Sequence, residues 1–296
     1  MAQPNLDDLL KAGVHFGHQT RRWNPKMRRF IFAERNGIHI IDLQKTLRQI
    51  ELAQKLAREV ILRGDNVLFV CTKRQLSAIV KEEAERSGAM YVTERWLGGL
   101  LTNFQTVKKQ IRRLKDLETG SETGGEFENY TKKEQLLMTR QRDKLAKNLS
   151  GIKNMTRIPG LMFVIDSKKE RIAVSEANKL GIPIVAIVDT NADPDVITVP
   201  IAGNDDAIRS VDLITKAIAD SIVEARREAP VRQEAEEGES NTYSSDRGME
   251  TASGDEDRRR RRRPRRRRAK PEAIAARLKS GAVDEVESIR PLSTKK

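Results

Sequence analysis

The sequence lacks most of the side chains on which thiol-dependent and zinc-dependent enzymes rely. Its 296 residues include one cysteine and three histidines. The single thiol, Cys71, has no partner for an internal disulfide, and paired cysteine ligands for zinc are absent. Cys71 also ends an apolar stretch and has no histidine beside it, which predicts a buried structural thiol. These features favour a cytoplasmic protein without a thiol nucleophile.

Long hydrophobic runs are also missing. No uninterrupted apolar segment approaches the roughly 18 residues that a membrane helix needs. The opening segment, MAQPNLDDLLKAG, carries acidic side chains early and has no long apolar centre. The sequence therefore predicts a chain that neither spans a membrane nor carries a secretory signal.

From residue 38 onward, short apolar strands alternate with amphipathic helices. Strands are expected at 38–42, 67–71, 89–92, 161–166, 183–189 and 197–199, with helices at about 43–63 and 74–87. The continuous apolar run at 67–71 is typical of a strand that is covered on both faces of a parallel sheet. The predicted fold class is α/β, with a doubly wound, mostly parallel sheet in a three-layer, flavodoxin- or Rossmann-like arrangement.

Residues 102–155 interrupt this pattern. Val107, Ile111 and Leu114 form a narrow apolar stripe at helical spacing, and a second helix is predicted after the capping-box pair Thr131 and Glu134. Such thin stripes predict an antiparallel helical hairpin that projects from an α/β body formed by 1–101 and 156–229.

The composition changes abruptly near residue 230, where glutamate, glycine, serine and arginine replace apolar residues. This change predicts a disordered tail over 230–296, acidic at first and then arginine-rich, with ten arginines between 258 and 268. An arginine run can grip ribosomal or messenger RNA, attract an acidic protein surface, or fold back on the preceding acidic stretch. Extra RNA contacts are the interpretation that we favour.

The stretch GVHFGHQTRRWNPKMRRFIF, residues 13–32, combines five cations with four aromatic side chains. Cations neutralise phosphates, and aromatic faces stack on unpaired bases, so this mixture is suited to RNA. The alternative is a basic surface loop whose aromatic residues pack inward. The formal net charge of +13 agrees with a polyanionic partner.

Two turns after predicted strands lack the glycines that let a backbone cradle a phosphate. The turn after 67–71 instead presents Lys73 and Arg74, and the turn after 161–166 presents Lys168. These cations suit an RNA phosphate that is held from outside. The alternative is ordinary helix capping, with Ser167 and Glu170 as a capping box.

A divalent metal is the only cofactor for which the sequence offers ligands. His18 lies near the N-terminus, while Asp189 and Asp205 follow later strands. Because loops after parallel strands meet at one edge of the sheet, these three side chains are able to converge on a metal. The alternative is that they make only hydrogen bonds and caps.

Three segments resemble the bacterial small-subunit ribosomal protein S2 family: residues 13–32, RWLGGLLTNF at 95–104, and residues 158–195. The likeness runs from about Asp7 to Ala225 and does not reach the last seventy residues or so. It implies a ribosome-associated structural protein with no catalytic residues. The family binds 16S ribosomal RNA between the head and body of the subunit, close to messenger RNA, among other small-subunit proteins. It also supports docking of ribosomal protein S1.

The candidate RNA-binding residues combine these observations. They are Arg21, Arg22, Trp23, Lys26, Arg28, Arg29, Lys73, Arg74, Arg95, Asn103, Lys108, Lys109, Arg112, Arg113, Lys132, Lys133 and Lys168. Two other functions stay open from the residues alone. One is an α/β enzyme that acts on an anionic small molecule or nucleotide in the strand-end crevice, and the other is an RNA chaperone driven by the arginine tail.

Overall fold

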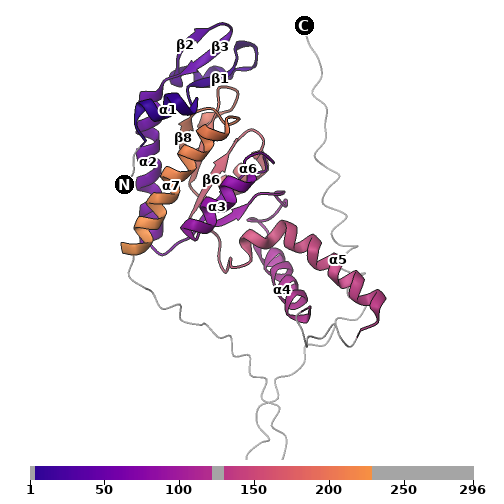
Figure 1. The fold of residues 1–296 in the computed structure, drawn as a ribbon. Coiled ribbons are helices and arrows are strands. Elements are labelled where there is room, and N and C mark those ends of the chain that lie inside the picture. Colours follow the sequence, from indigo (N-terminus) through magenta and orange to yellow (C-terminus); the bar gives the residue numbers. More distant parts are fainter. Residues whose placement is uncertain (1–3, 122–129, 229–296) are drawn as a thin grey trace, which may run out of the picture. The chain divides into compact units, whose positions relative to one another are not determined.

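The computed structural model describes residues 4–121 and 130–228 (Figure 1). The tail predicted over 230–296 lies outside the described residues. In the described part of the chain, no helix is long and apolar enough to cross a membrane.

A five-stranded parallel sheet forms the centre of the body, as the predicted fold class requires. Its strands are β4 (Val67–Val70), β5 (Met90–Val92), β6 (Leu161–Ile165), β7 (Ile184–Val188) and β8 (Val199–Ala202). They lie in the order β5-β4-β6-β7-β8. Taken in chain sequence this is the order 2-1-3-4-5, which is flavodoxin-like.

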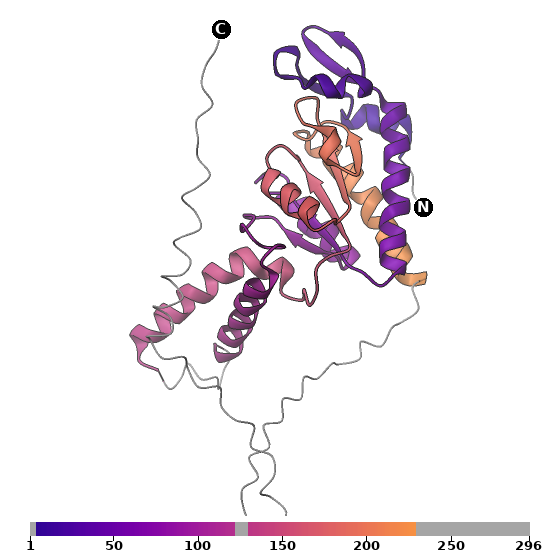
Figure 2. The same cartoon turned by 180° about the vertical axis from the view of Figure 1, so that it is seen from behind.

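Helices cover both faces of this sheet because successive strand residues point to opposite sides. The phenyl rings of Phe69 and Phe163 lie 5.2 Å apart on the face that is covered by α1 (Leu6–Ala12), α2 (Leu43–Leu62), α3 (Ser77–Ser87) and α7 (Ile208–Glu228) (Figure 1). Leu68 and Val164 point the other way and belong to a second hydrophobic cluster with residues of α6 (Arg171–Lys179). Figure 2 shows α6 on that side of the sheet. The sheet and the helices that cover its two faces make the three layers of the fold.

A second sheet corrects one expectation. The strand expected at 38–42 exists as β3 (Ile38–Ile41), but it pairs antiparallel with β1 (Phe16–Gln19) and β2 (Ile31–Arg35) rather than joining the parallel sheet. Asn36 and Gly37, both at positive φ, form the tight turn between β2 and β3. Asn-Gly is the favoured pair for such a turn because both positions need left-handed backbone conformations. Two short 3-10 helices, η1 (Thr20–Arg22) and η2 (Pro25–Phe30), connect β1 to β2.

The two helices expected between 102 and 155 are α4 (Phe104–Gly120) and α5 (Lys132–Leu149), which pack against each other. The capping box predicted at Thr131 and Glu134 is confirmed. Val107 and Leu149 are buried in the same hydrophobic cluster as the α6 face of the sheet. After α5, the 3-10 helix η4 (Ser150–Ile152) packs against β5, so the base of the hairpin is fixed to the edge of the sheet. A last 3-10 helix, η5 (Pro194–Val196), precedes β8.

Candidate nucleic-acid interface

The N-terminal basic segment is tied to the loop that follows β7. The Lys26 ammonium lies 2.8 Å from Asp193 and 3.1 Å from Asp195, and the Arg29 guanidinium lies 3.1 Å from Asp195. The hydrogen bonds that its ammonium donates to Asp193 and Asp195 raise the pKa of Lys26. The charges of Lys26 and Arg29 are therefore compensated by these carboxylates. In contrast, Arg21, Arg22 and Arg28 are exposed and form no ion pair in the described part of the chain.

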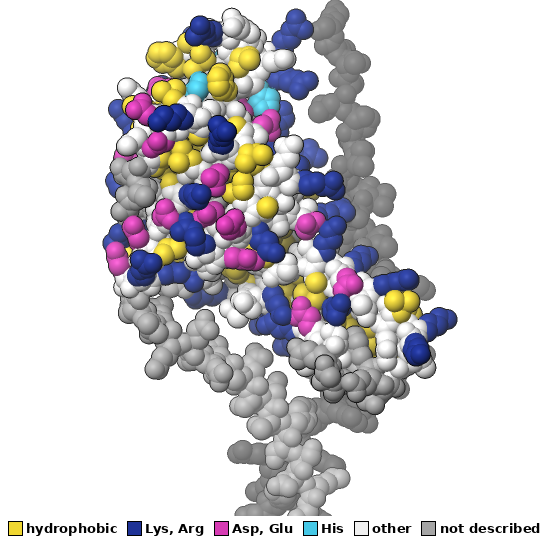
Figure 3. Space-filling view, viewed as in Figure 1, with side chains coloured by type: hydrophobic (Ala, Val, Ile, Leu, Met, Phe, Trp, Pro, Cys, Tyr) yellow, Lys and Arg dark blue, Asp and Glu magenta, His cyan; other side chains and the backbone are white. Residues whose placement is uncertain are grey.

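The aromatic residues of this segment divide between core and surface. Phe30 is buried, and the Trp23 ring lies 5.1 Å from the ring of His39. In contrast, Phe16 is 50% exposed and Phe32 is 76% exposed. Figure 3 shows hydrophobic side chains gathered at the end of the molecule where β1, β2 and β3 lie. Some rings therefore anchor the segment and others face solvent, and RNA binding by this segment stays a prediction.

A buried carboxylate shapes the loop 95–103. Glu176, on α6, accepts hydrogen bonds from the Trp96 indole at 3.1 Å and from the backbone N–H groups of Gly99 at 2.7 Å and Leu101 at 3.0 Å. Thr102 also donates to it. Burial alone raises the pKa of Glu176, but the hydrogen bonds from Gly99, Trp96 and the neighbouring amides outweigh burial and lower the pKa. The carboxylate is therefore ionised, and it holds the loop that presents Arg95 and Asn103.

The charges of the hairpin differ from those of the α2–α3–α7 face. On that face several cations lie beside carboxylates, as in the pairs Arg58–Glu228, Arg86–Asp220 and Lys216–Asp212. Figure 3 shows the two charges mixed over it. The candidate cations of the hairpin are exposed and form no ion pair among the described residues. They are Lys108, Lys109, Arg112, Arg113, Lys132 and Lys133. Phosphates are the natural counter-ions for such a set.

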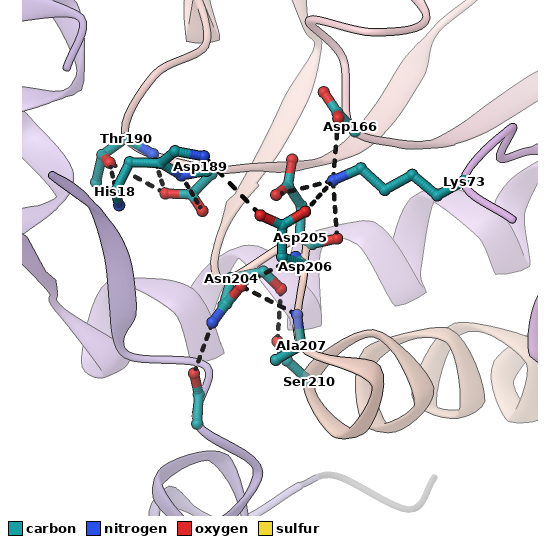
Figure 4. A network of polar contacts seen from close by, with 11 residues as sticks. His18, Lys73, Asp166, Asp189, Thr190, Asn204, Asp205, Asp206, Ala207 and Ser210 are labelled. Carbon is teal, nitrogen blue, oxygen red and sulfur yellow. Dashed lines mark hydrogen bonds and ion pairs between the residues drawn. The ribbon is translucent and has the colours of Figure 1, made fainter. Parts of the chain in front are cut away.

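The candidate Lys73 is turned inward (Figure 4). Its ammonium lies 3.0 Å from Asp166, 3.1 Å from Asp205 and 2.8 Å from Asp206. Burial alone lowers the pKa of Lys73, but these carboxylates outweigh it and raise the pKa. Lys73 thus neutralises an internal acidic cluster and is not available to an outside phosphate, whereas Arg74 and Lys168 are exposed.

The same ion pairs bear on the enzyme alternative. In a sheet of this order, small ligands bind where the connections from the strands diverge, which is between β4 and β6. Lys73 follows β4 and Asp166 follows β6, and their side chains meet at this point. Side chains of the chain itself therefore fill the position at which a doubly wound enzyme places its ligand.

The capping box proposed at Ser167 and Glu170 is wrong. The Glu170 carboxylate turns away from the start of α6 and accepts hydrogen bonds from the backbone N–H and hydroxyl of Thr72. Asp166 caps this turn instead, because its side chain accepts the N–H of Lys169. Burial raises the pKa of Glu170. Its hydrogen bonds with Thr72 connect the turn that follows β6 to the end of β4.

The three metal-ligand candidates converge as predicted. The donor atoms of His18, Asp189 and Asp205 all lie within 4.8 Å of one another. His18 Nδ1 lies 2.8 Å from the buried Asp189 carboxylate, and this hydrogen bond raises the pKa of the imidazole (Figure 4). Burial raises the pKa of Asp205 to about 6. An imidazole and two carboxylates form a donor set that suits a divalent transition metal.

Sequence reasoning did not find the parts that hold these candidates together. Glu176 looks like a surface position of α6, and its partners lie more than seventy residues earlier in the chain. Thr190 was also missed, although its hydroxyl accepts the backbone N–H of His18 and so positions the imidazole. For the cluster of His18, Asp189 and Asp205, the sequence signal was the N-terminal histidine together with the aspartates that follow two strands.

Comparison with known proteins gives a consistent result. The family model for ribosomal protein S2 matches residues 9–225. The small ribosomal subunit protein uS2 of Corynebacterium diphtheriae is 56% identical over 227 residues, covering 77% of this chain and 85% of that protein. The uS2 protein of Acidothermus cellulolyticus is 56% identical over 224 residues, covering 76% of this chain and 82% of that protein. The uS2 protein of Mycobacteroides abscessus is also 56% identical over 224 residues, with 76% and 80% covered.

Proposed function

Since the chain belongs to the ribosomal protein S2 family, and is thus a structural constituent of the small ribosomal subunit rather than an enzyme, we propose that it binds 16S ribosomal RNA through two surfaces. The first is the N-terminal basic segment, residues 13–32. The second consists of the helical hairpin, α4 and α5, together with the loop 95–103. The family resemblance supports a position between the head and body of the subunit, close to messenger RNA.

The distribution of unpaired cations carries this proposal. Several cations on the α2–α3–α7 face, including Arg58, Arg86 and Lys216, lie beside carboxylates of the same face, which compensate their charges. The six candidate cations of the hairpin, and Arg21, Arg22 and Arg28, have no such partners among the described residues. Each phosphate contact releases condensed counter-ions, so these cations supply salt-dependent affinity. The two packed helices of the hairpin form a surface that contacts RNA according to its shape.

The test is a titration of the full chain against 16S ribosomal RNA over a range of salt concentrations. The hairpin variant carries glutamine at Lys108, Lys109, Arg112 and Arg113. The control variant carries glutamine at Lys55, Lys81, Lys216 and Arg227 on the opposite face, so that both variants lose four charges. The slope of log affinity against log salt should flatten by about 3 in the hairpin variant. Equal slopes in the two variants would contradict the proposed surface.

We also propose that the exposed rings on the three-stranded sheet dock ribosomal protein S1. Phe16 and Phe32 present aromatic surface to solvent on β1 and β2, the two outer strands of the sheet. Exposed apolar patches with charged surroundings mark protein contacts. The change Phe32→Ala should weaken the binding of S1 to isolated small subunits. The matched control, Leu136→Ala, removes an exposed apolar side chain from α5 and should leave S1 binding unchanged. Equal losses in both variants would count against this docking surface.

A divalent metal at His18, Asp189 and Asp205 is a second proposal. The ion would fasten β1 to the loops that follow β7 and β8, because His18 comes from β1 and the two aspartates from those loops. Zinc titrated into the chelator-treated chain should bind at one equivalent and raise the melting temperature. Asp205→Asn should remove that rise. A chain that holds no stoichiometric metal after purification and gains no stability from added zinc would exclude the site.

A further inference from the structure

A cavity that has no assigned role opens between α6 and the loop that follows β7. Its volume is about 680 Å³. One wall is a single face of α6 and its preceding turn, from Ser167 to Lys179, and the other is the segment from Asn191 to Val196. This volume lies within the range of pockets that enclose small organic ligands. The cavity is separate from the Lys73 ion pairs and from the His18 cluster, none of which lines it.

Polar groups inside the cavity lack partners. Ser167 is 6% exposed, and its hydroxyl makes no hydrogen bond within the described part of the chain. Asn191 Oδ1 is buried and also has no hydrogen-bond partner there. An unsatisfied buried polar atom costs about 1–3 kcal/mol in general, so Asn191 Oδ1 calls for an N–H or O–H donor, which a water molecule or a ligand in the cavity would supply.

The charge of the cavity selects an anion. Lys168, Arg171 and Lys179 line it along α6 and form no ion pair among the described residues. The only carboxylate in the lining, Asp193, is compensated by the Lys26 ammonium at 2.8 Å. Ordinary counter-ions for three unpaired cations around a pocket are phosphate oxygens.

The remaining lining adds a surface for a flat ring. Val174, Ala192 and Val196 present apolar atoms in the cavity, and Asn178 keeps its side-chain oxygen free because its amide N–H donates to the Val196 carbonyl. The apolar atoms, the acceptors and the cations of the cavity are complementary to the flat ring, the edge N–H donors and the phosphate of a nucleotide. Proteins recognise the unpaired bases of single-stranded RNA in this manner, by stacking on the base and by hydrogen bonds to its edges.

We propose that this cavity binds a single nucleotide, with the base against Val174 and Val196 and the phosphate against Lys168 and Arg171. Asn191 Oδ1 then accepts an N–H group from the edge of the base. The nucleotide comes from an unpaired position of a bound RNA strand or from the free pool. This inference rests on the proposed binding of ribosomal RNA. Its test distinguishes a failure of nucleotide binding in the cavity from a failure of ribosomal RNA binding.

The test uses the full chain in calorimetric titrations with AMP, CMP, UMP and a six-residue oligoadenylate. Ser175→Trp places a ring at the exposed edge of the cavity without removing a charge, and Lys168→Ala removes one of its cations. Lys55→Ala removes an equally exposed cation from α2 and serves as the control. AMP, CMP and UMP should each bind at one equivalent. Lys168→Ala should weaken binding by about tenfold, as expected for a charge-assisted contact, and Ser175→Trp should abolish it.

The source of the nucleotide follows from comparing the binding of AMP, of the oligoadenylate and of ribosomal RNA. Tighter binding of the oligoadenylate than of AMP, with a loss of 16S ribosomal RNA affinity in Ser175→Trp, identifies a strand as the source. Binding of AMP with unchanged ribosomal RNA affinity in Ser175→Trp identifies the free nucleotide. If no nucleotide binds and Ser175→Trp holds ribosomal RNA as tightly as the unmodified chain does, this inference is overturned while the proposed function stands. Failure of the unmodified chain to bind ribosomal RNA refutes the proposed function by itself.

Discussion

Replacing Glu176 by glutamine tests how the loop 95–103 is held. One carboxylate oxygen accepts the Trp96 indole N–H and the Gly99 N–H, and the other accepts Leu101 and Thr102. Glutamine keeps one acceptor oxygen and turns an NH₂ group toward the donors of the other side. At least two buried donors then lose their acceptor, at about 1–3 kcal/mol each, so the free energy of unfolding should fall by roughly 3 kcal/mol.

Urea denaturation followed by circular dichroism measures this change at pH 7. Glu82→Gln is the matched control, because Glu82 is exposed on α3 and accepts no hydrogen bond in the described part of the chain. The control should stay within about 0.5 kcal/mol of the unmodified chain. A loss below about 0.5 kcal/mol in Glu176→Gln would refute the role given to this carboxylate.

The pH dependence of the same measurement gives an independent check. Hydrogen bonds lower the folded-state pKa of Glu176 below its ordinary value of 4.5, so its contribution to stability is present above that value. The contribution disappears as the pH falls through the lower pKa of the folded state. The difference in stability between the unmodified chain and Glu176→Gln should therefore shrink below about pH 4. A difference that stays constant down to pH 3 would mean that the charge of Glu176 does not contribute.

Three further predictions follow from particular residues. Gly151→Ala should lower the free energy of unfolding by about 1–3 kcal/mol or more in urea denaturation, since its new Cβ would lie 2.1 Å from the Tyr91 carbonyl oxygen; an unchanged value would contradict the close packing of η4 on β5. With a chelator present, Asp205→Asn should raise thermal stability at pH 7, because burial raises the pKa of Asp205 to about 6 and its ionised form is disfavoured in the folded state. That gain should vanish as the pH falls from 6 to 4 in a series of melting curves, and a destabilised variant at pH 7 would contradict it. Deletion of residues 231–296 should leave the circular dichroism melting of the body unchanged while flattening the salt dependence of binding to 16S ribosomal RNA; an unchanged slope would argue against RNA contacts by the tail.

The parallel sheet was predictable because its strands are buried on both faces and therefore appear as continuous apolar runs, as at 67–71. The antiparallel sheet was not recognised, although Asn36 and Gly37 provide a strong local signal for the turn between β2 and β3. Expecting one repeating pattern from residue 38 onward caused that error, since β3 resembles any other short apolar strand.

That Asp189 and Asp205 lie close together was predictable from topology, because loops after adjacent parallel strands share one edge. His18 joins them from β1, which belongs to the antiparallel sheet. The fate of Lys73 was not, because Lys73 and Lys168 look alike in the sequence as cations after strands. Burial and three carboxylates from distant loops decide that Lys73 faces inward. Pairing between residues so far apart leaves no local pattern to read.

Cross-linking of RNA to protein in isolated small subunits tests the central claim most directly, with the linked peptides identified by mass spectrometry. The account predicts that cross-links from 16S ribosomal RNA fall in residues 13–32, in the loop 95–103 and on α4 and α5. Cross-links confined to α2, α3 and α7, where cations already lie beside carboxylates, would contradict it.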